Sequence, residues 1–98
     1  MSLLFLPDGG PTEFIGNTFI QWTTYNASRV GVALGVESLT DDCGSAPTAE
    51  LIVKCREFLQ NAQRNPFHPY QDLVDRVERL YRLCTEAIDQ QHPIIRWG

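Results

Sequence analysis

The second half of the chain carries two amphipathic helix patterns, and these restrict the possible folds more than any other feature. In the later pattern, apolar side chains recur every three or four residues, the spacing of one face of an α-helix. This stripe comprises Leu73, Val77, Leu80, Cys84 and Ala87. It predicts a helix over residues 71–90.

An earlier stripe with the same spacing predicts a second helix. It comprises Leu51, Cys55, Phe58 and Ala62. Pro47 suits the first turn of this helix, and Ser45 or Thr48 could cap its start. Two prolines within residues 64–70 separate the two stripes, so residues 45–92 are predicted to form an antiparallel helical hairpin.

Each stripe is broader than the seam that two helices can bury against one another. The remaining apolar surface must be covered, either by the first half of the chain or by a second copy. This requirement links the fold to a predicted homo-oligomer.

The first half reads mainly as sheet. Leu3–Leu6 is a short apolar run that ends at a cluster of turn residues, which predicts a strand. Residues 13–25 fit either a helix or a strand, and their threonine and aromatic content favours a strand over 18–25. The segment 39–46 is polar and is predicted to be a loop.

Residues 29–36, RVGVALGV, alternate bulky and small side chains. This period of two predicts a strand, joined to the preceding one by a turn at 25–28. Its small residues allow three interpretations: helices pack closely on them, a ligand lies there, or the segment is a helix in which Gly31 and Gly35 form a packing face. Close packing is the favoured one.

The predicted architecture is therefore α+β, with two or three short antiparallel strands packed against the helical hairpin. With 98 residues, the chain is too short for two hydrophobic cores and forms a single domain. Residues 1–40 make the β-rich part and 45–92 the hairpin. The tail, residues 93–98, returns as an edge strand or lies over the core.

Charge and composition exclude several classes of function. The formal charge is −4 and Lys54 is the one lysine, so nucleic acid is not an expected partner. The N-terminal apolar run is too short for a leader or a membrane span, and the chain is expected to be cytoplasmic. Three cysteines at spacings that match no zinc motif predict reduced thiols, with no metal and no cofactor.

Acidic and basic residues alternate along the later helix. Each arginine follows an acid by four residues, in the pairs Asp72–Arg76, Asp75–Arg79 and Glu78–Arg82. Such pairs stabilise an exposed helix. The pattern predicts a solvated, self-neutralised helix face rather than a binding site.

Two cysteines belong to the apolar stripes. Cys55 and Cys84 are therefore expected to pack in the core as small apolar side chains. Cys43 follows two aspartates that would raise its pKa. A hydrolase built on Cys43 and His68 is thus the least favoured hypothesis.

The absence of a catalytic or cofactor motif favours a non-enzymatic protein that binds another protein as a homo-oligomer. Phages and mobile elements encode accessory and inhibitor proteins of this kind. Aromatic side chains are the usual anchors of protein interfaces. The candidate partner-binding residues are Trp22, Phe67, Tyr70 and Trp97, and the competing interpretation for each is core packing.

The alternative function is an oligomer that binds a small anionic ligand, such as a nucleotide or a metabolite. Arg29 and Arg56 have no obvious local partner in the sequence. Arginine binds carboxylate and phosphate groups in bidentate geometry. These two residues are the candidate ligand-binding site.

Overall fold

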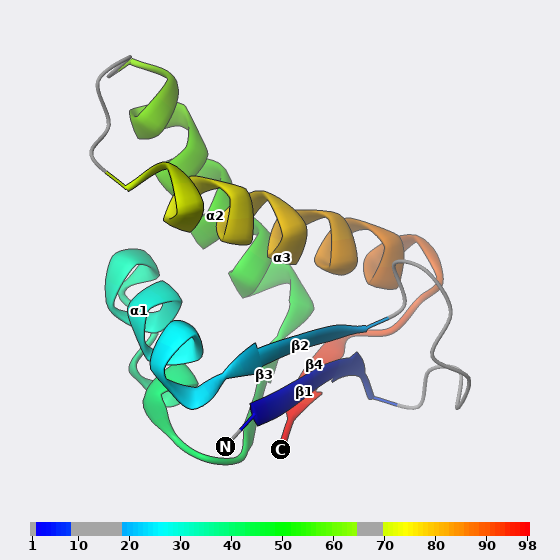
Figure 1. Ribbon diagram of the computed structural model, residues 1–98. Helices are drawn as coiled ribbons and strands as arrows, with labels where there is room; N and C mark the ends of the chain where they lie inside the picture. Colours follow the sequence, from blue (N-terminus) through cyan, green and yellow to red (C-terminus); the bar gives the residue numbers. More distant parts are fainter. Residues whose placement is uncertain (1, 9–18, 65–69) are drawn as a thin grey trace.

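A computed structural model of the protein describes residues 2–8, 19–64 and 70–98. In this part of the chain, four strands form one antiparallel sheet with three helices on one side of it (Figure 1). The elements are β1 (Ser2–Pro7), β2 (Ile20–Thr23), α1 (Thr24–Leu34), the 3-10 turn η2 (Glu37–Thr40), β3 (Gly44–Pro47), α2 (Thr48–Gln63), α3 (Gln71–Asp89) and β4 (Ile94–Trp97). The predicted α+β class is confirmed, with more strands than expected.

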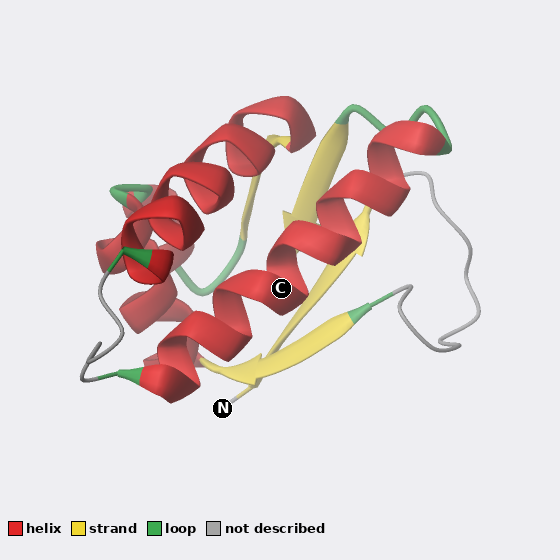
Figure 2. Cartoon of the chain, turned by 90° about the horizontal axis from the view of Figure 1, so that it is seen from above, coloured by secondary structure: helices red, strands yellow, loops and turns green. Residues whose placement is uncertain are grey.

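The core lies between the helices and one face of the sheet. Figure 2 shows α2 and α3 side by side above the strands. Phe5 is fully buried at the centre of the sheet, with its ring centroid 5.3 Å from that of Trp22 and 5.6 Å from that of Trp97. The buried stripe of α3 belongs to the same cluster, so the sheet covers the surface that the helical hairpin leaves exposed.

The two predicted helices are confirmed, but the predicted cap of the earlier one is wrong. Pro47 is the N-cap of α2 and makes no capping side-chain hydrogen bond. Thr48 is completely buried; its hydroxyl donates to the carbonyl oxygen of His92 at 2.9 Å, and its amide donates to that of Pro93 at 2.8 Å. Thr48 thus ties the start of α2 to the start of β4.

The largest difference from the sequence prediction concerns residues 24–34, which form α1 rather than a turn and a strand. Thr23 caps this helix, because its hydroxyl accepts a hydrogen bond from the amide of Asn26 at 3.1 Å. Gly35 ends it in the left-handed conformation, with φ of 72°. The buried residues Ala27, Val30, Gly31 and Leu34 follow helical spacing. The bulky residues of 29–36 follow strand spacing equally closely, so periodicity alone does not decide between a helix and a strand.

Gly31 shows which of the three interpretations of the small residues in 29–36 applies. A Cβ atom at this position would lie 2.9 Å from Leu39 Cβ and 3.0 Å from the carbonyl oxygen of Val36. Helix α1 therefore packs closely on the turn η2. The interpretation as a helix with a small packing face is correct at Gly31, whereas Gly35 serves the helix end.

The sheet contains one strand that the sequence did not predict. Residues 44–47 form β3 instead of part of a polar loop, and they pair with β4. The C-terminal strand is internal rather than at an edge, since the order is β2-β1-β4-β3. Strand β1 was predicted correctly, and β2 occupies only the middle of the predicted 18–25.

Candidate functional site

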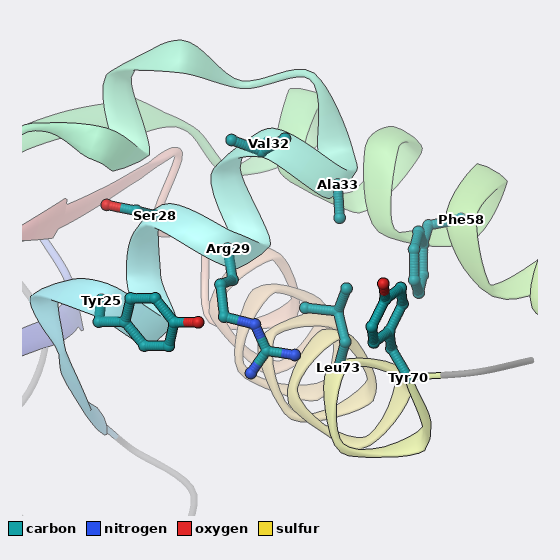
Figure 3. Close-up of a pocket in the computed structure, with 8 residues that line it drawn as sticks. All are labelled: Tyr25, Ser28, Arg29, Val32, Ala33, Phe58, Tyr70 and Leu73. Atoms are coloured by element: carbon teal, nitrogen blue, oxygen red, sulfur yellow. The ribbon is translucent and has the colours of Figure 1, made fainter.

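The main surface cavity is a groove between the three helices, with a volume of about 670 Å³. Its walls are mostly apolar. The residues that line it are Tyr25, Ser28, Arg29, Val32, Ala33, Phe58, Tyr70 and Leu73 (Figure 3). Five of them come from α1, and the others come from α2, from α3 and from the residue that precedes α3.

Exposed apolar side chains gather at this groove. Tyr25 is 72% exposed, Val32 is 76% exposed and Tyr70 is 56% exposed. Among the described residues, only Val53 and Ile88 are other large apolar side chains with comparable exposure, and neither lines the groove. Clustering of this kind marks binding surfaces more often than single exposed residues do.

One charged pair bridges α1 and α3 beside the groove: Arg29 lines the groove, and Asp72 is not among the lining residues. The Arg29 guanidinium donates to both carboxylate oxygens of Asp72, at 2.7 Å and 3.4 Å, and also to Asn26 Oδ1 at 3.3 Å. The same guanidinium lies 5.8 Å from the ring centroid of Tyr25, within cation–π range. Figure 3 shows Arg29 extending from α1 toward α3.

The pair shifts the pKa values of both groups in the direction that keeps them charged. The hydrogen bond between them raises the pKa of Arg29 and lowers that of Asp72. Because the two charges cancel, the groove offers apolar walls and a neutral polar bridge. The eight lining residues include no cysteine, histidine or carboxylate; their polar groups are the hydroxyls of Tyr25, Ser28 and Tyr70 and the guanidinium of Arg29.

Two of the four candidate partner-binding aromatics belong to the core. Trp22 and Trp97 are buried and both pack on Phe5, which confirms the competing interpretation for them. Tyr70 is exposed and lines the groove. Phe67 lies outside the described residues.

The structure separates the two candidate ligand-binding arginines. Arg29 lines the groove, and its partner is not local in the sequence: it pairs with Asp72 of α3. Arg56 is exposed on α2 and is not among the residues that line the groove. A site formed by both guanidinium groups is not assembled within one copy of the chain.

Among the described residues, none of the three charge pairs predicted along α3 forms an ion pair. Asp72 forms its ion pair with Arg29 of α1 rather than with Arg76 on its own helix. Arg79 donates to the carbonyl oxygen of Phe19 at 2.7 Å. Arg29 and Arg79 thus help to attach α3 to α1 and to the residue before β2.

The cysteines lie where the sequence placed them. Cys55 and Cys84 are fully buried, and burial raises the pKa of Cys84 to about 12 and also raises the pKa of Cys55. Cys43 is exposed. The hydrolase hypothesis pairs it with His68, which lies outside the described residues.

A second, smaller depression of about 340 Å³ lies between β2 and α3. It is lined by Trp22, Asp72, Asp75, Arg76 and Arg79. Acidic and basic side chains are balanced there, and the groove between the helices has the larger apolar surface.

Of the eight groove residues, sequence analysis named only Arg29 and Tyr70 as site residues. Those it missed include Tyr25, Val32 and Phe58. Tyr25 was assigned to a turn, Val32 to a strand and Phe58 to the core stripe of its helix. The signal that could have found the first two is their spacing of seven residues, which places them on the same side of a helix two turns apart.

Comparison with known proteins gives this site no assignment: no protein family, curated protein or solved structure matches the chain. Among residues 2–8, 19–64 and 70–98, no helix is long and apolar enough to cross a membrane. The same residues contain no group of three metal-binding side chains.

Proposed function

We propose that this chain is a non-enzymatic interaction protein whose groove receives apolar side chains from a helical segment of a partner protein. One observation carries the proposal: Tyr25, Val32 and Tyr70 are exposed and converge on the same groove. A helix that docks in a groove presents anchors every three or four residues. The groove runs along α1, whose 11 residues span about 16 Å.

The exposed aromatic surface is large enough to contribute to affinity. Two tyrosines with side chains of about 200 Å² each, exposed by 72% and 56%, leave roughly 250 Å² open to solvent. At about 25 cal/mol per Å², covering this area contributes about 6 kcal/mol. Association costs about 4–15 kcal/mol, so a partner must also contact Val32 and the groove walls.

The test is a selection of displayed helical peptides on the full-length protein, with Val32→Glu as the counter-selection target. Val32 is exposed, so this change leaves the fold intact while it places a charge in the groove. Val53→Glu is the matched control, because Val53 is an exposed valine outside the groove. Selected peptides are expected to bind the wild type and Val53→Glu but not Val32→Glu or Tyr70→Ala. Equal binding to all four proteins would contradict the proposal.

A second candidate, binding of a small amphipathic anion, is favoured by the position of Arg29 in the groove. The volume of about 670 Å³ lies within the usual range for small-molecule sites. The Asp72 carboxylate opposes this function, because an anion would have to compete for the guanidinium. A thermal-shift screen of nucleotides and metabolites tests it: stabilisation by one compound, lost in Arg29→Gln, would favour this candidate over the first.

The proposal also covers the biological setting, that of an accessory or inhibitor protein acting in the cytoplasm. The three free cysteines support only the proposed compartment, because a reducing environment keeps thiols in that state. Affinity capture from the native host, compared between wild type and Val32→Glu, would identify the partner.

A further inference from the structure

We propose that a second copy of this chain occupies the groove, in a two-fold dimer in which the α1 helices lie antiparallel and each copy places Tyr25 in the groove of the other. This inference rests on the proposed function, since it names an occupant of the same groove.

The first support is the arrangement of side chains around α1. Ala27, Val30, Gly31 and Leu34 form its buried side. At 100° per residue, Tyr25, Ser28, Arg29 and Val32 lie on the opposite side. Tyr25 and Val32 are the two most exposed large apolar residues among those that the structure describes. The outward side of α1 is therefore apolar at both ends and carries Ser28 and Arg29 near its middle.

The second support is that this surface is complementary to itself. A two-fold axis midway between residues 28 and 29 places Tyr25 of each helix opposite Val32 of the other, and Ser28 opposite Arg29. Both copies make the same contact, as a two-fold interface requires. Ser28 near the axis lets the helices approach to the usual distance of about 8–10 Å.

The third support is the shape of the groove at its far end. Figure 3 shows Phe58 and Tyr70 next to one another, across from Ala33 and away from Tyr25. In the dimer, the tyrosine of the second copy would have to extend from Val32 past Ala33 to reach these two rings. Aromatic rings in offset or edge-to-face contact attract one another beyond the effect of burial.

The fourth support is electrostatic. Each copy carries a formal charge of −4, so two copies repel one another over most of their surfaces. Arg29 is the one charged residue of α1, and Asp72 neutralises it. Two α1 helices can therefore meet without opposing net charge.

The size of the surface predicts the strength of the dimer. The exposed parts of Tyr25 and Tyr70 amount to roughly 250 Å² per copy, or about 500 Å² for both copies before Val32 and the groove walls are added. Stable interfaces bury about 1,600 Å² in total, and weak ones less than about 1,200 Å². The dimer is therefore expected to be weak and to depend on concentration.

Sedimentation equilibrium of the full-length protein tests the proposal between about 10 μM and about 1 mM, the range that brackets the dissociation constant of about 100 μM expected of a weak dimer. Wild type and Val53→Glu are expected to shift from monomer to dimer across this range, whereas Val32→Glu and Tyr25→Ala stay monomeric. Circular dichroism melting confirms that the variants fold. A wild type that remains monomeric throughout, or a Val32→Glu variant that dimerises like the wild type, would overturn the proposal.

A disulfide test checks the register without altering the anchors. With Cys43→Ser as background, Ser28→Cys places thiols of the two copies beside the axis and is expected to form a covalent dimer under mild oxidation. Val53→Cys in the same background is the control and is expected to stay monomeric. Equal cross-linking of both, or none at Ser28→Cys, would contradict the antiparallel arrangement.

The outcomes separate this inference from the proposed function. Selected peptides that bind through Val32 to a protein that is monomeric at all concentrations would refute the dimer and leave the proposed function in place. A dimer that requires Val32, together with no peptide that binds the groove, would refute the hetero-partner function and retain the dimer. If both hold, a bound peptide is expected to dissociate the dimer, because the two compete for one groove.

Discussion

Gly31 within α1 and Gly35 at the end of this helix serve different physical purposes. A Cβ atom at Gly31 would collide with Leu39 and with the carbonyl oxygen of Val36, so the missing side chain permits the close approach of η2. Gly35 has free space around it but adopts a φ of 72°, a backbone conformation that residues other than glycine rarely adopt. At Gly31, packing excludes a side chain. At Gly35, the backbone conformation excludes one.

Replacing Gly31 with alanine tests the packing constraint. Alanine gains about 1 kcal/mol of helix propensity over glycine, but forcing a methyl group against the backbone of Val36 costs about 1–3 kcal/mol. We expect Gly31→Ala to lower the free energy of unfolding by about 1 kcal/mol, measured by urea denaturation. Ser28→Ala on the exposed side of α1 is the control and should be neutral or slightly stabilising. A Gly31→Ala protein more stable than wild type would show that η2 can move away.

The three cysteines should differ sharply in reactivity. Cys55 and Cys84 are buried and their pKa values are raised, so at pH 8 they hold almost no thiolate. Cys43 is exposed. We expect iodoacetamide to add one label to the native protein and three labels after denaturation, measured by intact mass. Native Cys43→Ser should take up none, and a second label on the native wild type would indicate that the core opens.

At the scale of elements, the sequence identified those whose apolar pattern has a single interpretation. Helix α3 has many consecutive turns with one apolar side, and its predicted start at residue 71 is correct. Helix α1 was missed because Val30, Val32, Leu34 and Val36 also alternate, and its capping by Thr23 shows only once the chain is folded. Strand β3, GSAP, has low intrinsic strand preference, and its pairing with β4 defines it.

The ion pair between α1 and α3 should make stability depend on pH in one direction. The pKa of Asp72 is lowered in the folded state, so the folded protein binds fewer protons than the unfolded chain near that pKa. The stabilisation is present above the ordinary value of 3.8 and is lost as the pH falls through the lower folded value.

Asp72→Asn should therefore melt at a lower temperature than wild type at pH 6, and the difference should shrink as the pH falls below 3.8. Thermal melts followed by circular dichroism from neutral to acid pH measure it. Glu86→Gln, an exposed position further along α3, is the control. A difference between Asp72→Asn and wild type that stays constant with pH would show that the change acts through packing rather than charge.

At the scale of the whole molecule, the groove could not be predicted because it depends on tertiary structure. Its residues come from three helices, and Tyr25 and Tyr70 are 45 positions apart in the sequence. Sequence reasoning proposed Tyr70 because aromatic residues anchor interfaces, but it also proposed Trp22 and Trp97, which the sheet buries. Residue type alone does not separate an anchor from a core residue; the position of the sheet does.

The sheet order makes the last strand essential to the whole fold. Strand β4 lies between β1 and β3, and it buries Ile95 completely and Trp97 almost completely. Removal of residues 93–98 deletes both side chains, each worth about 2–5 kcal/mol in a core. It also removes the Pro93 carbonyl that accepts from the amide of Thr48.

This combined loss is comparable to the total stability of a small domain, about 5–15 kcal/mol, so the truncated chain is expected to lose its cooperative thermal transition in circular dichroism. Arg96→Ala is the control, because it removes an exposed side chain and one surface ion pair with Asp8 and keeps the strand; we expect its stability to change by about 0.5 kcal/mol or less. A truncated chain that still melts in one sharp step would show that β1, β2 and the helices form a core without β4. In that case β3 would lose the partner that defines it, and the helices would have to cover the exposed edge of β1.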